Sequence, residues 1–160
     1  MTHTVYVGFG EHKVSTSPDT VLTCFGLGSC VAVMLYDRKK QIGGMLHVVL
    51  PTSNGTRASN PMRFADTGIP LLVEEMHKKG ADKKHLTAKL VGGAKILRFP
   101  QISHSELDIG VRNVQMCEEV LRKLGLRIIG QETGGTQGRT VTFRIDSGEA
   151  FVRQRGDKEI

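Results

Sequence analysis

The chain has 160 residues, and its 22 Lys and Arg against 16 Asp and Glu give a formal net charge of +6. That length fits a single domain over residues 1–160, and the 39% of hydrophobic residues excludes a mostly disordered chain. No apolar run approaches the ~18 residues of a membrane-spanning helix, and the N-terminus lacks the pattern of a secretory signal, so no membrane insertion is expected. The basic balance would suit an acidic partner, but the scattered lysines, few aromatic residues and absence of Trp argue against a nucleic-acid surface.

Three cysteines, Cys24, Cys30 and Cys117, occur without a signal peptide. This odd number indicates free thiols in a reducing compartment, so a cytoplasmic protein is expected. Cys24 and Cys30 do not have the spacing of a zinc-binding pair, and the chain contains no second pair. The sequence therefore predicts no metal, and no motif in it indicates another cofactor.

Several runs rich in β-branched and aromatic residues, bounded by Gly, Pro or polar turns, predict strands. They cover Val5–Val7, Val21–Phe25, Val31–Tyr36, Ile42–Leu50, Leu86–Val91, Arg127–Gln131, and a hairpin of Thr140–Ile145 with Glu149–Arg153. Residues 51–61 form a polar loop with Asn54-Gly55 at its tip, and residues 98–108 have the composition of a variable surface loop. Together with two helices, these strands predict an α+β domain.

The first helix is predicted between about residues 60 and 79. Asn60 can cap its start, and Gly80 can end it as the left-handed residue. Pro70 leaves two possibilities: it kinks this helix, or the helix proper starts near Thr67 and Pro70 lies in its first turn.

The second helix, from about Arg112 to Leu124, is the clearest element. Its apolar face consists of Val114, Cys117, Leu121 and Leu124, and Gly125 ends it. Cys117 is therefore expected to be a core residue rather than a reactive one.

The segment Gly26-Leu27-Gly28-Ser29-Cys30 joins two predicted strands. It lacks the third glycine and following helix of a dinucleotide-binding loop, and the Gly-Lys-Ser/Thr of a Walker loop. Its two glycines can instead bring backbone N–H groups beside Cys30, which would suit an oxyanion hole next to a thiol nucleophile. The alternative is a structural cysteine in a tight turn.

A hairpin of the strands before and after Arg38-Lys39, with these two residues as its loop, puts Cys30 directly opposite His47. Directly opposed residues have Cβ atoms ~4.5–5.5 Å apart, so an imidazolium there could activate the thiol. A slip of one residue would put the two side chains on opposite faces. The alternative for His47 is a strand histidine bonded to a backbone carbonyl. Thr23, Cys24 and Ser29 are candidates for a third group that orients the imidazole.

Six segments, in this order, give the chain a resemblance to the CheD family of bacterial chemoreceptor glutamine deamidases. They are Gly26-Leu27-Gly28-Ser29-Cys30, His47-Val48-Val49-Leu50-Pro51, Phe64-Ala65-Asp66-Thr67, Gly92-Gly93-Ala94, Ile109-Gly110-Val111-Arg112-Asn113, and Glu132-Thr133-Gly134-Gly135 with Gly138-Arg139.

The resemblance implies a protein-glutamine glutaminase, an amidohydrolase that converts glutamine side chains on chemoreceptors into glutamate and ammonia. It implies a Cys–His–Thr catalytic set, in which Cys30 and His47 take the first two roles. The candidate oxyanion donors are the backbone N–H groups of the glycine turn, at Gly28 and Ser29. The family threonine lies six residues before the cysteine, where this chain has Cys24. Thr23 preserves the chemistry one position earlier, but neighbouring residues on a strand face opposite ways.

The resemblance also implies a layered β-sheet core flanked by helices, like the catalytic domain of deamidating toxins. The partners it implies are the cytoplasmic helices of chemoreceptors and a CheC-type phosphatase. Because the threonine is displaced, a second hypothesis remains: a largely non-catalytic regulator that docks receptors or the phosphatase.

Overall fold

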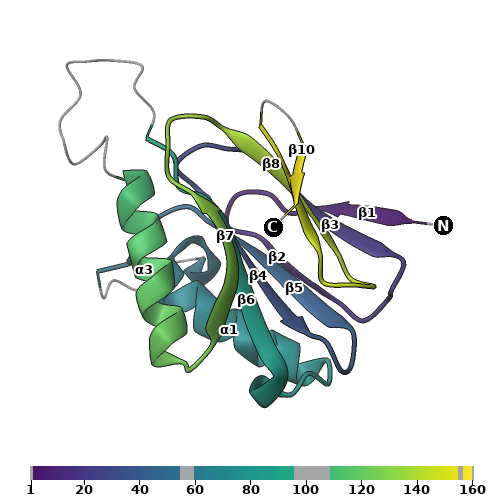
Figure 1. Ribbon diagram of the computed structural model, residues 1–160. Helices are drawn as coiled ribbons and strands as arrows, with labels where there is room; N and C mark the ends of the chain where they lie inside the picture. Colours follow the sequence, from purple (N-terminus) through teal and green to yellow (C-terminus); the bar gives the residue numbers. More distant parts are fainter. Residues whose placement is uncertain (1, 55–59, 96–108, 155–156, 160) are drawn as a thin grey trace, which may run out of the picture.

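The computed structural model describes residues 2–54, 60–95, 109–154 and 157–159. Their strands form two five-stranded sheets (Figure 1). Sheet A has the order β1 (His3–Tyr6), β3 (Thr20–Leu27), β8 (Arg139–Arg144), β9 (Ala150–Arg153), β10 (Asp157–Glu159). Sheet B has the order β2 (His12–Ser15), β5 (Ile42–Val48), β4 (Val31–Asp37), β6 (Leu86–Gly92), β7 (Arg127–Thr133).

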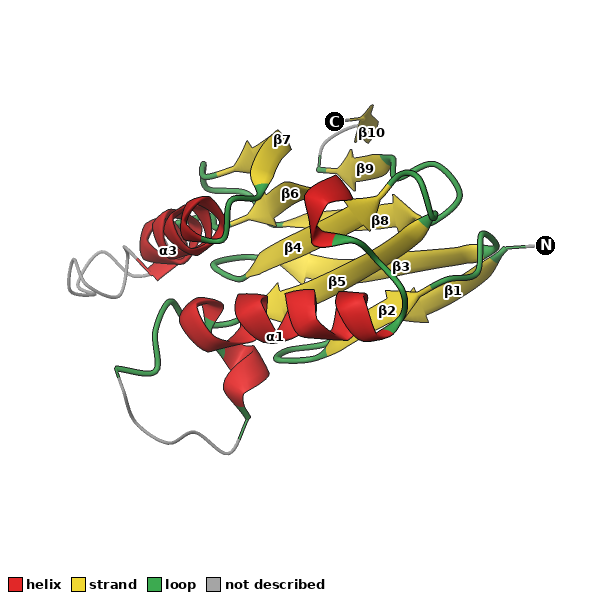
Figure 2. Cartoon of the chain, turned by 90° about the horizontal axis from the view of Figure 1, so that it is seen from below, coloured by secondary structure: helices red, strands yellow, loops and turns green. Residues whose placement is uncertain are grey.

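Two α-helices, α1 (Ala65–Lys78) and α3 (Ile109–Lys123), lie on one side of the strands (Figure 2). Two short 3₁₀ turns, η1 (Pro61–Arg63) and η2 (Lys83–His85), precede α1 and β6. One apolar core lies between the helices and sheet B, and a second lies between sheets B and A. The expected α+β fold with layered sheets and helices is thus confirmed, with both helices against the same sheet.

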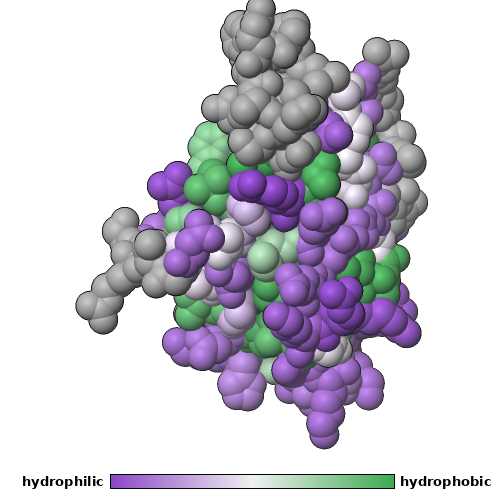
Figure 3. All heavy atoms as spheres, turned by 90° about the vertical axis from the view of Figure 1, so that its left-hand side faces the viewer, coloured by the Kyte–Doolittle hydropathy of each residue, from purple (hydrophilic) through white to green (hydrophobic). Residues whose placement is uncertain are grey.

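The outward faces of these helices are polar. Arg122 and Lys123 of α3 are exposed, whereas Cys117 and Leu121 are fully buried. Hydrophilic side chains accordingly predominate on the face seen in Figure 3, with smaller hydrophobic patches between them. The assignment of Cys117 to the core is confirmed.

Strand β4 lies at the centre of sheet B, between the two cores. All seven of its residues are buried, and its odd-numbered and even-numbered apolar residues enter different cores. Because both faces are covered, its sequence is a continuous apolar run rather than an alternating one.

The predicted helices are confirmed with shifted starts. Asn60 caps the 3₁₀ turn by accepting a hydrogen bond from the Met62 amide, and Phe64, with extended backbone, separates this turn from α1. Pro70 lies inside α1, beyond its first turn, so the alternative of a helix that starts near Thr67 was wrong. Gly80 follows α1 with a φ of 105°. Helix α3 begins at Ile109, three residues earlier than predicted.

All predicted strands are present, but β2 and β10 were missed because they have only four and three residues and no apolar run. The predicted loop at 98–108 and the loop tip at Gly55 lie outside the described residues. None of the described helices has the length and apolarity needed to cross a membrane.

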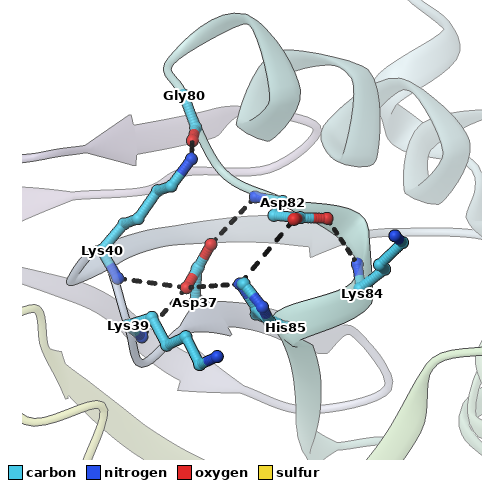
Figure 4. Close-up of polar contacts among 7 residues, drawn as sticks. All are labelled: Asp37, Lys39, Lys40, Gly80, Asp82, Lys84 and His85. Atoms are coloured by element: carbon cyan, nitrogen blue, oxygen red, sulfur yellow. Dashed lines mark hydrogen bonds and ion pairs between the residues drawn. The ribbon is translucent and has the colours of Figure 1, made fainter.

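The predicted register of the β4–β5 hairpin is wrong by two residues. Ala32, not Cys30, pairs with His47, and Asp37 pairs with Ile42. The reason is the buried Asp37 carboxylate, whose Oδ1 accepts hydrogen bonds from the Lys39 and Lys40 amides and so stabilises a four-residue turn (Figure 4). Because the shift is two residues, every side chain keeps its face.

Asp37 also joins this turn to the chain beyond α1, because its Oδ2 accepts a hydrogen bond from the Asp82 amide (Figure 4). Burial alone would raise the pKa of Asp37, but the backbone donors, together with the nearby His85, outweigh burial and lower the pKa below its ordinary 3.8. The stabilisation from the carboxylate is therefore present at neutral pH and is lost only as the pH falls below that value.

The substitution Asp37→Ala is expected to lower the free energy of unfolding by about 2–3 kcal/mol, because it removes the acceptor of three backbone N–H groups. Urea unfolding measures the change. Glu75→Ala, which removes only a surface pair with Lys78, is the control and should change it by less than about 0.5 kcal/mol. Equal effects of the two substitutions would contradict this role of Asp37.

Candidate active site

The predicted nucleophile, Cys30, lies at the end of a tight turn between sheets A and B. A register shift after Cys24 interrupts the β3–β8 pairing, and Gly26 has a φ of 55°, which favours glycine. Cys30 directly precedes β4 and is 8% exposed, whereas Cys24 and Cys117 are fully buried. Of the three thiols, Cys30 is thus the one that solvent reaches.

The carbonyl groups of this turn are all bonded to neighbouring elements. The Gly28 and Cys30 carbonyls accept hydrogen bonds of 2.8 Å from the Ala94 and Gly93 amides, and the Ser29 carbonyl accepts one of 2.8 Å from the Asn113 side chain. No described residue accepts a hydrogen bond from the amides of Gly28, Ser29 or Cys30. These three N–H groups, without an acceptor in the described part of the chain, belong to the turn that carries the thiol, as an oxyanion site requires.

Gly92 allows β6 to approach this turn closely. A Cβ atom at this position would lie 2.2 Å from the Cys30 carbonyl oxygen, and its φ of 119° also favours glycine. The glycines of the segment Gly92-Gly93-Ala94 thus have a steric reason, the close contact of two backbones.

His47 faces the same core as Cys30, diagonally across the β4–β5 pair. Its pairing with Ala32 puts Cys30 two residues along on that face, where side chains of diagonal neighbours can still meet. Its Nδ1 lies 3.0 Å from the Val7 carbonyl oxygen, and no described residue is hydrogen-bonded to its buried Nε2. Because a carbonyl can only accept, the neutral ring carries its proton on Nδ1 and has a free lone pair on Nε2.

The loop between β1 and β2 fixes the position of His47. The His47 amide donates to the Glu11 carbonyl at 3.1 Å, and the His47 carbonyl accepts from the Gly10 amide at 3.0 Å. The ring of Phe9 meets the imidazole edge-on, with 5.0 Å between centroids, although Phe9 itself is 74% exposed. The sequence analysis missed this loop, since only the exposed aromatic between two glycines hints at it.

Burial favours the neutral forms of both the Cys30 thiol and the His47 imidazole. Burial raises the pKa of Cys30 above its ordinary 9.0. Burial lowers the pKa of His47 below its ordinary 6.5, more than its hydrogen bond to Val7 raises it. A neutral imidazole can accept the thiol proton, which is one of the two ways in which His47 was expected to activate Cys30.

Cys24 and Thr23 face opposite sides of sheet A. The fully buried Cys24 faces the core between the sheets, where its thiol contacts the Val7 carbonyl at 3.5 Å, the same oxygen that His47 contacts. Thr23 is 2% exposed and lines a shallow groove on the outer face of sheet A, where its hydroxyl has no partner among the described residues. Thr23 thus does not lie beside His47.

Brief iodoacetamide treatment near neutral pH is expected to alkylate Cys30 first and Cys117 last. Burial raises the pKa of Cys24 to about 12 and that of Cys117 further, and neither side chain is exposed. Peptide mass mapping over time gives the order. Preferential labelling of Cys117 would contradict both assignments.

No cluster of three or more His, Cys, Asp or Glu side chains in the described part of the chain could hold a metal ion. Cys30 and His47 face the same core, and the amides of the turn have no acceptor among the described residues. Groups of these kinds are the ones that thiol-dependent acyl chemistry on an amide or ester requires.

The comparisons with known proteins identify the family. The family model described as CheD chemotactic sensory transduction matches residues 49–154. The chain is 44% identical to a probable chemoreceptor glutamine deamidase CheD of Desulforamulus reducens, over 95% of this chain and 91% of the relative, and 45% identical to one of Caldanaerobacter subterraneus, over 94% and 92%. A solved Neisseria meningitidis protein of family DUF152 is similar with a TM-score of 0.45 and 10% identity, over 78% of this chain and 51% of that chain. The chain belongs to the CheD family.

Proposed function

We propose that this chain hydrolyses the side-chain amide of glutamine residues on chemoreceptors, with Cys30 as the nucleophile. Membership of a family whose curated relatives carry the name of this activity supports the reaction. The observation that carries the mechanism is the pair of Cys30 and His47 on one face, with the His47 Nε2 lone pair free.

In the first half of the reaction, His47 Nε2 takes the Cys30 proton as Sγ attacks the amide carbon. The oxygen of the tetrahedral intermediate gains a negative charge, and the amides of Ser29 and Cys30 are the donors nearest the nucleophile. Collapse of the intermediate breaks the carbon–nitrogen bond, and the proton on His47 passes to the nitrogen, which leaves as ammonia. A thioester on Cys30 remains.

In the second half of the reaction, a water molecule enters the site that ammonia has left. His47 removes a proton from the water, whose oxygen attacks the thioester carbon. Collapse expels the Cys30 sulfur, which regains the proton from His47, and the product is glutamate. The Val7 carbonyl keeps the neutral imidazole in the required tautomer, because it accepts a hydrogen bond from Nδ1–H.

The experiment that tests the function is ammonia release from purified chemoreceptor cytoplasmic fragments, combined with mass mapping of the glutamines that become glutamates. Release by the wild-type chain supports the proposal. Binding of the fragment without any release would favour the alternative, a regulator that only docks receptors. We also propose a cytoplasmic location and a CheC-type phosphatase as a second partner, and a pull-down with such a phosphatase tests the latter.

The third position of the catalytic set belongs to Cys24 in this proposal, because it shares the Val7 carbonyl with His47. A thiol is a weak hydrogen-bond partner, so Cys24→Thr is expected to raise turnover by about 2–10-fold. Thr23→Ala, on the opposite face, is the matched control and should leave turnover within about 2-fold. Ammonia release measures both variants. If Thr23→Ala abolished release while Cys24→Thr changed nothing, the two roles would be reversed.

A further inference from the structure

Asn113 of α3 connects the two chain segments that carry the catalytic pair. Its fully buried side chain donates through Nδ2 to the Ser29 carbonyl at 2.8 Å and to the Val49 carbonyl at 3.0 Å. Ser29 directly precedes Cys30, and Val49 follows His47 by two residues. One amide group thus holds both segments at a fixed separation.

The hydrogen bond from Asn113 to the Ser29 carbonyl also fixes the orientation of the peptide unit between Ser29 and Cys30. The Ser29 carbonyl and the Cys30 N–H belong to one planar trans peptide unit, in which they point opposite ways. When Asn113 holds the carbonyl toward α3, the Cys30 N–H must point away from α3. The preceding unit is held in the same manner by the Ala94 amide, which leaves the Ser29 N–H unbonded as well.

The start of the helix that carries Asn113 packs closely against the segment that follows β6. A Cβ atom on Gly110 would lie 2.2 Å from the Ala94 carbonyl oxygen, so only glycine permits this close contact at the start of α3. Asn113 is one helical turn beyond Gly110. Its Oδ1 is buried and has no partner among the described residues, so the two Nδ2 hydrogen bonds are the polar contacts that hold this side chain.

We propose that Asn113 is a positioning residue for deamidation, which aims the Cys30 N–H at the oxyanion. This inference rests on the proposed function. A purely structural role would affect the free energy of unfolding and every property of the site together. If Asn113 positions the oxyanion donor, its loss should slow deamidation, which forms an oxyanion, more than alkylation of Cys30, which forms none.

The test compares Asn113→Ala and Asn113→Ser with Val120→Ala, a matched truncation of a buried α3 residue in the helix core. For each variant, kcat and KM are measured from ammonia release, and the rate of Cys30 alkylation by iodoacetamide is measured separately. We expect Asn113→Ala to lower kcat by about 10²-fold with KM within about 3-fold. Alkylation forms no oxyanion and should stay within about 3-fold, Asn113→Ser should recover part of kcat through its hydroxyl donor, and Val120→Ala should keep kcat.

Three results would overturn the inference while the wild-type chain is active: a kcat of Asn113→Ala within about 3-fold of wild type, an equal loss of kcat and of Cys30 alkylation, or a similar loss in Val120→Ala. Failure of both Asn113 variants to fold would assign the residue a structural role and also overturn it. A wild-type chain that releases no ammonia would instead refute the proposed function itself, and the inference with it.

Discussion

Replacing Cys30 by alanine is expected to lower glutamine deamidation by at least ~10⁴-fold, because the reaction then has no nucleophile and only the oxyanion donors and substrate binding remain. The side chain is small and 8% exposed, so the fold should tolerate the change. Ammonia release from a receptor fragment at saturating concentration measures the effect, and binding of the fragment should persist.

The matched control is Cys117→Ala, which removes an equally small thiol from the core beside α1 and sheet B. It should keep turnover within about 3-fold, since Cys117 lies away from the site. Residual turnover by Cys30→Ala within about 10-fold of wild type would contradict the assignment of the nucleophile.

The substitution His47→Gln is expected to lower kcat by about 10²–10⁴-fold, because it removes the base while it keeps a polar side chain of similar length. The pH dependence of kcat/KM is a second and more specific test. Burial lowers the pKa of His47, so the neutral imidazole persists below its ordinary 6.5 and wild-type kcat/KM should fall only as the pH drops below that value.

In His47→Gln this acid limb should disappear. Measurement of kcat/KM between pH 4.5 and 8, a range that brackets the ordinary histidine value of about 6.5, separates the two enzymes. An acid limb centred above 6.5 would mean that the titrating group is not a buried imidazole. If kcat/KM of His47→Gln fell at low pH as it does in the wild type, the titrating group would not be His47.

Sequence patterns were sufficient for the parts of the fold that rest on local signals. The apolar face of α3, the end of α1 at Gly80 and the runs that became β3, β4 and β6 all follow from periodicity and from Gly or Pro. The hairpin register failed because it depends on how many residues the turn holds. The Asp37 carboxylate decides this number through two backbone amides of the turn and a third from far along the chain.

The same error explains why the pairing of Cys30 and His47 was predicted on the correct face but at the wrong distance. A shift of two residues preserves the face of each side chain, so the two residues are diagonal instead of directly opposed. The bulge after Cys24 does not turn Thr23 toward His47. It lies beyond Thr23, which keeps its regular pairing with Thr142.

The orienting groups could not be predicted from local sequence. The Val7 carbonyl is a backbone atom 40 positions away from His47, and Asn113 is 84 positions from Ser29. Contacts of this kind depend on how sheets A and B and helix α3 pack together, for which the chain carries no periodic signal. The segment that contains Asn113 was noted as a family motif, but nothing in it indicated which atom it would bind.

The most direct test of Cys30 as nucleophile is to trap its thioester. The wild-type chain and His47→Gln would be mixed with excess receptor fragment, quenched with acid, and digested for peptide mass mapping. The expected result is a receptor peptide joined through a glutamine-derived acyl group to Cys30, removable by hydroxylamine. Ammonia release with Cys30 unmodified throughout, or an adduct on any other residue, would contradict the mechanism.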